Sequence, residues 1–162
     1  MTIETRQATA ADLPALTALF REMEVHYEGP AAMSEAAIRS SLERRVFADE
    51  PCASALIAEE AGRLLGYAFT CPLYPAPAGK PALFVMDIFV SAAERSRGVG
   101  RALMQAVARR AAAGGYSRVS WAVQRANADA RAFYASLGAT QREELVLMRL
   151  DGAALTRLAG EA

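Results

Sequence analysis

The apolar positions along the chain follow two periods, one typical of helices and one typical of strands. Apolar residues three and four positions apart, which form one face of a helix, recur in several segments. Thr9 and Asp12 have the spacing of a capping box, and Gly29-Pro30 is expected to end the first helix near Tyr27. The predicted helices cover residues 13–27, 35–47, 98–113 and 128–137, with a short helix from 152.

Runs of apolar residues between turn residues predict the strands. Ser54–Glu60 and Leu64–Cys71 flank an Ala-Gly-Arg turn and are predicted to form a hairpin. The strongest strand signal is Ala82–Val90, and further strands are predicted at 3–6, 118–123 and 145–150. Residues 72–81 are too rich in Pro and Gly for regular structure and form either a surface loop beside a site or a spacer.

Composition narrows the class of protein. With 162 residues, 53% of them apolar, and with no repeat or linker, residues 1–162 are expected to form a single mixed α/β domain. The 18 basic and 18 acidic residues balance, which argues against a nucleic-acid partner. The N-terminus lacks a signal-peptide pattern, and no apolar stretch is long enough to span a membrane. We therefore expect no membrane partner and a cytoplasmic location, and the abundance of Ala and Arg suggests a bacterial source.

Neither cysteine has the spacing expected of metal ligands. Cys52 and Cys71 also form no disulfide framework, so we expect reduced thiols and no metal.

The stretch ERSRGVGRALM, residues 94–104, joins the strongest strand to the strongest helix. The start of a helix offers unpaired N–H groups and a partial positive charge, and glycines there allow a ligand to approach the backbone. Three arginines add positive charge, so the local pattern favours a phosphate or pyrophosphate site. The spacing fits neither a P-loop nor a dinucleotide fingerprint, since Leu103 stands where the third glycine would be. The alternative is a helix start carrying solvated arginines.

Two motifs in this sequence carry a resemblance to a known family. Arg95-Ser-Arg-Gly98-Val-Gly100 resembles the [QR]-x-x-G-x-[GA] motif of the GNAT superfamily of acyl-CoA N-acyltransferases, and Asn127 to Gly138 is similar to that family's N-x-x-A-x-x-F-Y-x-x-x-G segment. The resemblance implies a mixed, mostly antiparallel sheet flanked by helices. It also implies that a splayed strand pair forms the acyl-CoA cleft and that acetyl-CoA is the co-substrate.

The resemblance also assigns roles to individual residues. Tyr134 is implied as the general acid that protonates the leaving thiolate; alternatively it is a core aromatic. Asn127 is implied as a cofactor contact, and it is also a good helix N-cap, roles that can coexist. The implied contacts of coenzyme A are Ile88, Phe89, Val90, Arg95, Ser96, Arg97, Gly98, Val99, Gly100, Arg101, Ala102, Asn127 and Tyr134.

Within the family the sequence looks like the diamine (spermidine/spermine) acetyltransferase branch. Tyr27 and Glu28 are similar to a Tyr-Glu pair at that branch's amine site, although Glu28 is equally a solvated helix end. That branch has Glu-Asp where this chain has Met86-Asp87, so the expected proton relay is missing. Successive strand residues point to opposite faces, so Asp87 cannot simply replace that Glu. It either serves the reaction, holding the substrate or acting through water, or is a structural carboxylate.

The resulting expectation is an acetyl-CoA-dependent N-acetyltransferase that acts on a primary amine of a small molecule. The alternatives are a protein or peptide N-acetyltransferase and a coenzyme A-binding module with little catalysis. A homodimer is also expected, through the last strand and the apolar tail; the alternative for residues 146–150 is an ordinary closing strand.

Overall fold

The computed structural model describes residues 2–73 and 80–160. It forms two compact units, Met1–Ala122 and Val123–Ala162. The first unit contains a five-stranded sheet built in chain order from β1 (Glu4–Gln7), β2 (Ser54–Glu60), β3 (Arg63–Leu73), β4 (Ala82–Val90) and β5 (Val119–Trp121). The first four strands are antiparallel and β5 runs parallel to β4. This arrangement confirms the predicted fold class, and the predicted hairpin is β2–β3.

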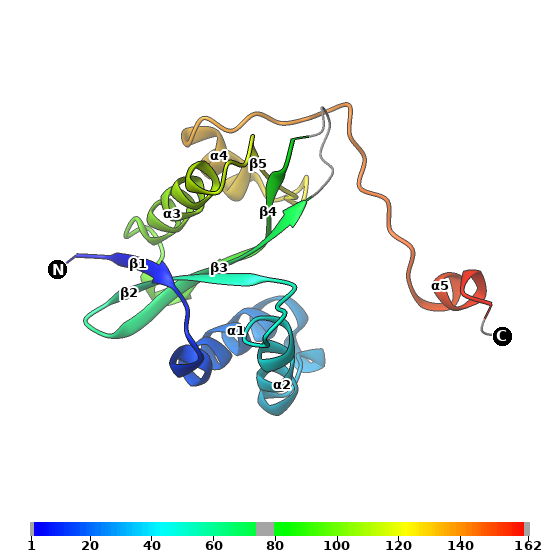
Figure 1. Cartoon of the computed structure of the whole chain (residues 1–162), viewed down its shortest axis with the longest axis horizontal. Coiled ribbons are helices and arrows are strands. Elements are labelled where there is room, and N and C mark those ends of the chain that lie inside the picture. Colours follow the sequence, from blue (N-terminus) through cyan, green and yellow to red (C-terminus); the bar gives the residue numbers. More distant parts are fainter. Residues whose placement is uncertain (1, 74–79, 161–162) are drawn as a thin grey trace. The chain divides into compact units, whose positions relative to one another are not determined.

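Helices cover both faces of this sheet (Figure 1). α1 (Leu13–Glu28) and α2 (Glu35–Arg45) bury Leu16, Leu19 and Ile38 on one face, in a core cluster that includes Tyr67 and Phe89. α3 (Val99–Ala113) packs on the other face, in a second core cluster. We call these the α1 face and the α3 face.

Gly66 allows α3 to begin close to the sheet. A Cβ atom at Gly66 would lie 2.7 Å from the carbonyl oxygen of Phe89 and 3.2 Å from the side chain of Val99. Since a real side chain cannot occupy that space, glycine here fixes the start of α3 next to β3 and β4.

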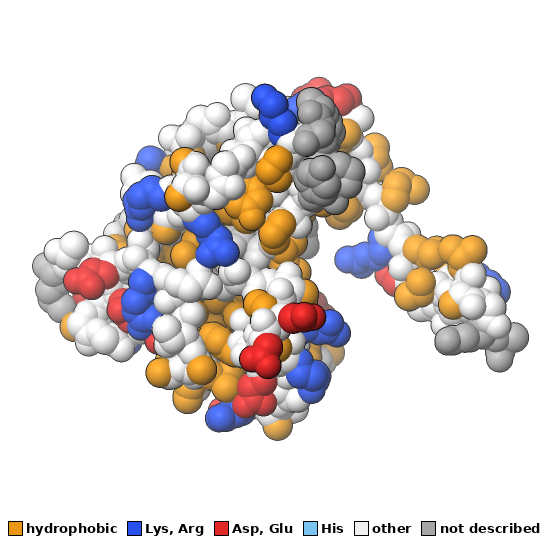
Figure 2. Space-filling model, viewed as in Figure 1, with side chains coloured by type: hydrophobic (Ala, Val, Ile, Leu, Met, Phe, Trp, Pro, Cys, Tyr) orange, Lys and Arg blue, Asp and Glu red, His pale blue; other side chains and the backbone are white. Residues whose placement is uncertain are grey.

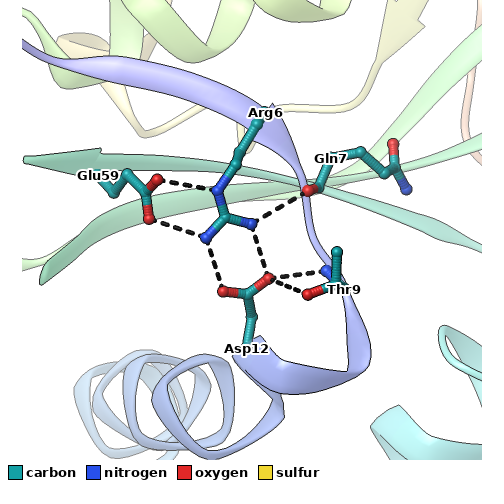
Figure 3. A network of polar contacts seen from close by, with 5 residues as sticks. All are labelled: Arg6, Gln7, Thr9, Asp12 and Glu59. Carbon is teal, nitrogen blue, oxygen red and sulfur yellow. Dashed lines mark hydrogen bonds and ion pairs between the residues drawn. The ribbon is translucent and has the colours of Figure 1, made fainter. Parts of the chain in front are cut away.

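Arg6 joins the first strand to the sheet and to the start of α1 (Figure 3). Its guanidinium donates to both carboxylate oxygens of Asp12, at 2.8 Å each, and to both of Glu59, at 2.8 and 2.9 Å. Asp12 also accepts from the N–H and the hydroxyl of Thr9, which confirms the predicted capping box. It opens a 3-10 turn, Ala10–Asp12, that leads into α1. The Arg6 hydrogen bonds hold the pKa of Asp12 well below its usual range.

The second unit contains α4 (Ala128–Ser136) and α5 (Gly152–Leu158). The strand predicted at 145–150 is wrong: those residues form neither helix nor strand. Their side chains are exposed, with Leu145, Val146, Leu147 and Met148 between 70% and 84% accessible. Figure 2 shows hydrophobic side chains on the surface of this segment and of α5. A strand needs a neighbour to pair with, and the described part of this unit contains none.

Candidate active site

β4 leaves part of its backbone unpaired. Its pairing with β5 covers only Leu83–Val85, so among the described residues the backbone of 86–90 has no strand partner on that side. On the other side, the pairing with β3 skips Met86, because Phe69 lies opposite Asp87 and Thr70 lies opposite Val85. This single-residue bulge leaves Met86 52% exposed. The opened edge contains Ile88, Phe89 and Val90 and can accept the amides of an extended ligand.

The turn after β4 is shaped by two residues with positive φ. Ser96 has φ of 63° and Gly98, the N-cap of α3, has φ of 87°. The first helical hydrogen bond runs from the Ala102 N–H to the Gly98 carbonyl at 3.0 Å. The N–H groups of Val99 and Gly100 therefore precede that bond and point out of the helix end, which is the geometry of an anion site.

The side chain of Arg97 is engaged in ion pairs. It donates to Glu60 at 2.8 Å and also to Glu94, and Arg63 pairs with Glu94 at 2.7 Å. Both carboxylates are buried, and hydrogen bonds from Arg63 and then Arg97 lower the pKa of Glu94. The Arg97 side chain thus fastens the loop to the β2–β3 hairpin.

Arg95 in the same loop and Arg101 in the first turn of α3 are exposed. The guanidinium carbon of Arg95 lies 6.0 Å from the centre of the Phe89 ring, which ties this side chain loosely to β4. These two arginines supply the positive charge at the surface of the loop.

Glu22 of α1 holds the residues that follow β4. Its carboxylate accepts from the Ser91 hydroxyl at 3.0 Å and from the Ala92 N–H at 2.8 Å. Both Glu22 and Ser91 line a shallow pocket of about 320 Å³ between α1 and the start of β3. We call the connection between β4 and α3, residues 91–98, the anion loop. It is therefore held both by α1 and by the β2–β3 hairpin.

Asp87 lies half-buried on the α1 face. Its Oδ2 accepts a hydrogen bond of 2.7 Å from the hydroxyl of Tyr67, a residue of β3. Burial raises the pKa of Asp87, the contacts with Tyr67 and the Ile88 N–H lower it, and the charge of Glu24 raises it. Sequence analysis missed both Tyr67 and Glu24. Glu24 lies one helical turn before Glu28, and that spacing was the available signal.

Tyr27 and Glu28 form the exposed end of α1. Tyr27 is 59% accessible, and its ring lies 4.9 Å from that of His26. Of the segment 72–81, predicted as an irregular loop beside a site or a spacer, residues 72 and 73 instead extend β3 by pairing with β4, and 74–79 lie outside the described residues.

Asn127 and Tyr134 belong to one helix of the second unit. The Asn127 side chain accepts from the Ala130 N–H at 3.0 Å, which confirms it as the N-cap of α4. Tyr134 is half-buried, and its ring centre is 5.1 Å from that of Phe133. Gly138, with φ of 88°, ends the helix through bonds from its own N–H to Ala135 and from the next N–H to Tyr134.

The described residues contain no group of three or more His, Cys, Asp or Glu side chains arranged to hold a metal ion. No helix within the described part of the chain is long and apolar enough to cross a membrane.

The sequence profile of the acetyltransferase (GNAT) family matches residues 14–139. The chain belongs to this family, whose members use acetyl-CoA. The opened β4 edge and the anion loop at the start of α3 lie within the matched region.

Individual relatives agree with this assignment. L-ornithine N5-acetyltransferase NATA1 of Arabidopsis thaliana is 38% identical over 90 residues, which are 56% of this chain and 40% of that protein. An integron cassette protein from the mobile metagenome of V. cholerae is 30% identical, covers 98% of both chains and superposes with a TM-score of 0.90. Aminoglycoside N-acetyltransferase AAC(6')-Iy in complex with CoA covers 91% of this chain and 94% of its own, at 22% identity and a TM-score of 0.75, and shares the fold.

Proposed function

We propose that this protein is an acetyl-CoA-dependent N-acetyltransferase that transfers the acetyl group to a primary amine of a small molecule by direct attack in a ternary complex. The observation that carries the proposal is the continuous path along β4. Its backbone at 86–90, which is open on the side away from β3, leads into a helix start that suits a pyrophosphate, and the half-buried carboxylate of Asp87 belongs to the same segment.

The acceptor class is supported by relatives and by charge. Two relatives are named as acetyltransferases of ornithine and of aminoglycosides, both of which carry primary amines. In this chain Glu24, Glu28 and Asp87 supply negative charge along the end of α1 and on β4. We assign Tyr27 and Glu28 to substrate binding, because a cationic amine is favoured beside exposed carboxylates.

The reaction requires four tasks of the chain. The ammonium of the acceptor loses a proton to the Asp87 carboxylate, directly or through one water, and its nitrogen then attacks the thioester carbon. A backbone N–H of Ile88, Phe89 or Val90 stabilises the oxygen that gains charge. The carbon–sulfur bond breaks, and the thiolate takes a proton from the Tyr134 phenol. The loop from Arg95 to Ala102 and Asn127 hold the coenzyme in the attack geometry.

Thiol release from acetyl-CoA, measured against a panel of amines, tests the proposal. The panel contains ornithine, putrescine, spermidine, an aminoglycoside and a lysine peptide. Release with a small amine is expected. Release only with the peptide would replace the proposal by a peptide N-acetyltransferase. Coenzyme A binding without amine-dependent release would indicate a binding module.

Tyr134→Phe separates catalysis from binding. The variant is expected to lose thiol release at least about tenfold while keeping its affinity for coenzyme A, because only the proton donor is removed. Full turnover in this variant would remove Tyr134 from the mechanism.

We also propose that residues 1–162 form a single domain and that the protein is a cytoplasmic homodimer. The family match runs from 14 to 139 and crosses the boundary at 122, which supports one domain. The exposed apolar side chains of 145–148 support an interface with a second copy. A light-scattering mass near that of two chains is expected, and a mass near one chain would reject the dimer.

A further inference from the structure

Tyr67 is held so that its hydroxyl can occupy only one place. The residue is fully buried, and its ring stacks on Phe20 of α1 with ring centres 5.9 Å apart and planes within 14°. Phe69 and Phe89 enclose the ring, with centres at 4.7 and 6.0 Å. These three aromatic rings leave the Tyr67 ring no room to turn aside, so its hydroxyl stays directed at Asp87.

The bulge at Met86 makes this contact possible. Tyr67, Phe69 and Phe89 all pack on the α1 face, and the strand pairing places Asp87 opposite Phe69. Because the pairing skips Met86, Asp87 lies on the same face as Tyr67 and Phe89 instead of the α3 face that a regular alternation from Val85 would give it. The sequence analysis assumed that side chains along this strand alternate strictly between the two faces. The bulge at Met86 breaks this alternation directly before Asp87.

The charges around Asp87 are those of a proton acceptor. The titratable groups that face it are Tyr67 from β3 and Glu24 from α1, with Tyr27 of α1 beside Tyr67. Burial and the charge of Asp87 raise the pKa of Tyr67, so its phenol remains a donor at working pH. Burial raises the pKa of Asp87, which makes it a stronger base than an exposed carboxylate.

We propose that Tyr67 is a positioning residue whose hydrogen bond fixes the Asp87 carboxylate in place to take the proton of the acceptor's ammonium. The inference rests on the proposed function. The N–H bond of the ammonium breaks, and its proton passes to the Asp87 carboxylate directly or through one water. The nitrogen lone pair is then free to attack the thioester. The bond from Tyr67 uses Oδ2, and the carboxylate keeps further acceptor sites for the proton.

Two substitutions near Asp87 are expected to move its titration in opposite directions. Tyr67→Phe keeps the ring and removes a hydrogen bond that favours the ionised carboxylate, so the acidic limb of the kcat profile should move up by about one pH unit. Below that limb kcat should fall about tenfold, while the KM for acetyl-CoA stays unchanged. Glu24→Gln removes a repelling charge and should move the limb to lower pH.

Matched substitutions elsewhere provide the controls. Tyr116→Phe changes a tyrosine packed against the other core cluster, and Glu43→Gln changes an exposed carboxylate paired with Arg39 on α2. Neither should move the acidic limb. Thermal melting of each variant checks that it is folded.

Carbon-13 NMR titration of the Asp87 carboxyl separates the two possible failures, because it needs no turnover. Tyr67→Phe should raise the measured pKa and Glu24→Gln should lower it. An unmoved titration, or an unmoved acidic limb in an active Tyr67→Phe variant, would overturn the inference and leave the proposed function standing. Absence of amine-dependent turnover in the unmodified protein would overturn both the proposed function and the role of Asp87 in proton transfer.

Discussion

Two carboxylates near opposite ends of α1, Asp12 and Asp87, show how the partner decides the role of an acidic side chain. Asp12 accepts two hydrogen bonds from Arg6, with 10% of its side chain exposed, and its pKa is lowered. Asp87 is half-buried, the groups that act on it are a phenol, a backbone N–H and a second carboxylate, and burial above all raises its pKa. The first carboxylate has its counter-charge inside the protein. Among the described residues, the groups that act on the second carboxylate include no cation, so a positively charged substrate can supply the counter-charge.

The largest effect is expected from Asp87→Asn. The amide keeps the shape and can still accept from Tyr67, but it cannot take up a proton. Amine-dependent thiol release should fall by at least about 100-fold, the usual contribution of a general base. Thermal stability at pH 7 should not fall. A variant with normal turnover would show that Asp87 is a structural carboxylate, like Asp12.

Removing the Arg6 guanidinium, the partner of Asp12, should lower the stability of the protein and leave its activity unchanged. Arg6→Ala leaves Asp12 and Glu59 without their shared partner, and Arg6 joins β1, β2 and the start of α1. Because the Arg6 side chain is 41% exposed, we expect a loss of about 1–2 kcal/mol in the free energy of unfolding, less than for a fully buried pair. Urea unfolding measures this loss. An unchanged urea midpoint would mean that the Arg6 network orients these elements without stabilising the folded state.

The two carboxylates should also give stability opposite dependences on pH. The lowered pKa of Asp12 adds stability above its unfolded value of about 3.9, and this stability is lost as the pH falls toward the folded pKa. Because the pKa of Asp87 is raised, the contribution of this carboxyl to stability is fully present below its unfolded value of about 3.9 and is lost as the pH rises through its folded pKa.

Urea unfolding at pH 7 and pH 3 separates the two contributions. Arg6→Ala should cost more at pH 7 than at pH 3. Asp87→Asn should be relatively more stable at pH 7 than at pH 3, compared with the unmodified protein. If the unfolding free energies of both variants changed in the same direction between pH 3 and pH 7, the two carboxylates would not differ as their partners predict.

The smallest effect is expected at an exposed pair. Arg39 and Glu43 lie one turn apart on α2, 3.2 Å from each other, with about half of each side chain in water. Arg39→Ala should change the unfolding free energy by less than about 0.5 kcal/mol. A larger loss would show that salt bridges in this protein cannot be ranked by burial.

The elements with local signals were predictable from the sequence. The capping box at Thr9, the β2–β3 hairpin and the α3 start at Gly98 all depend on neighbouring residues, and the structure contains them. The wrong strand at 145–150 has β-forming side chains, but pairing depends on a partner that local sequence does not specify.

The site could be predicted only in part, because its decisive contacts are distant in sequence. Tyr67 and Asp87 are 20 residues apart, and Arg97 and Glu60 are 37 apart. The run of residues 82–90 is almost wholly apolar, so no change in alternation marks the bulge at Met86. The motif identified the anion loop, but it did not indicate that Arg97 is engaged in ion pairs.

The exposed segment at 145–148 makes concentration a thermodynamic variable for this protein. Four consecutive large apolar side chains in contact with water represent hydrophobic free energy that folding of the single chain does not use. Any self-association that covers them is linked by mass action to the folded state, so the melting temperature should rise with protein concentration. A stability measured at one dilution is then a property of the solution as well as of the chain.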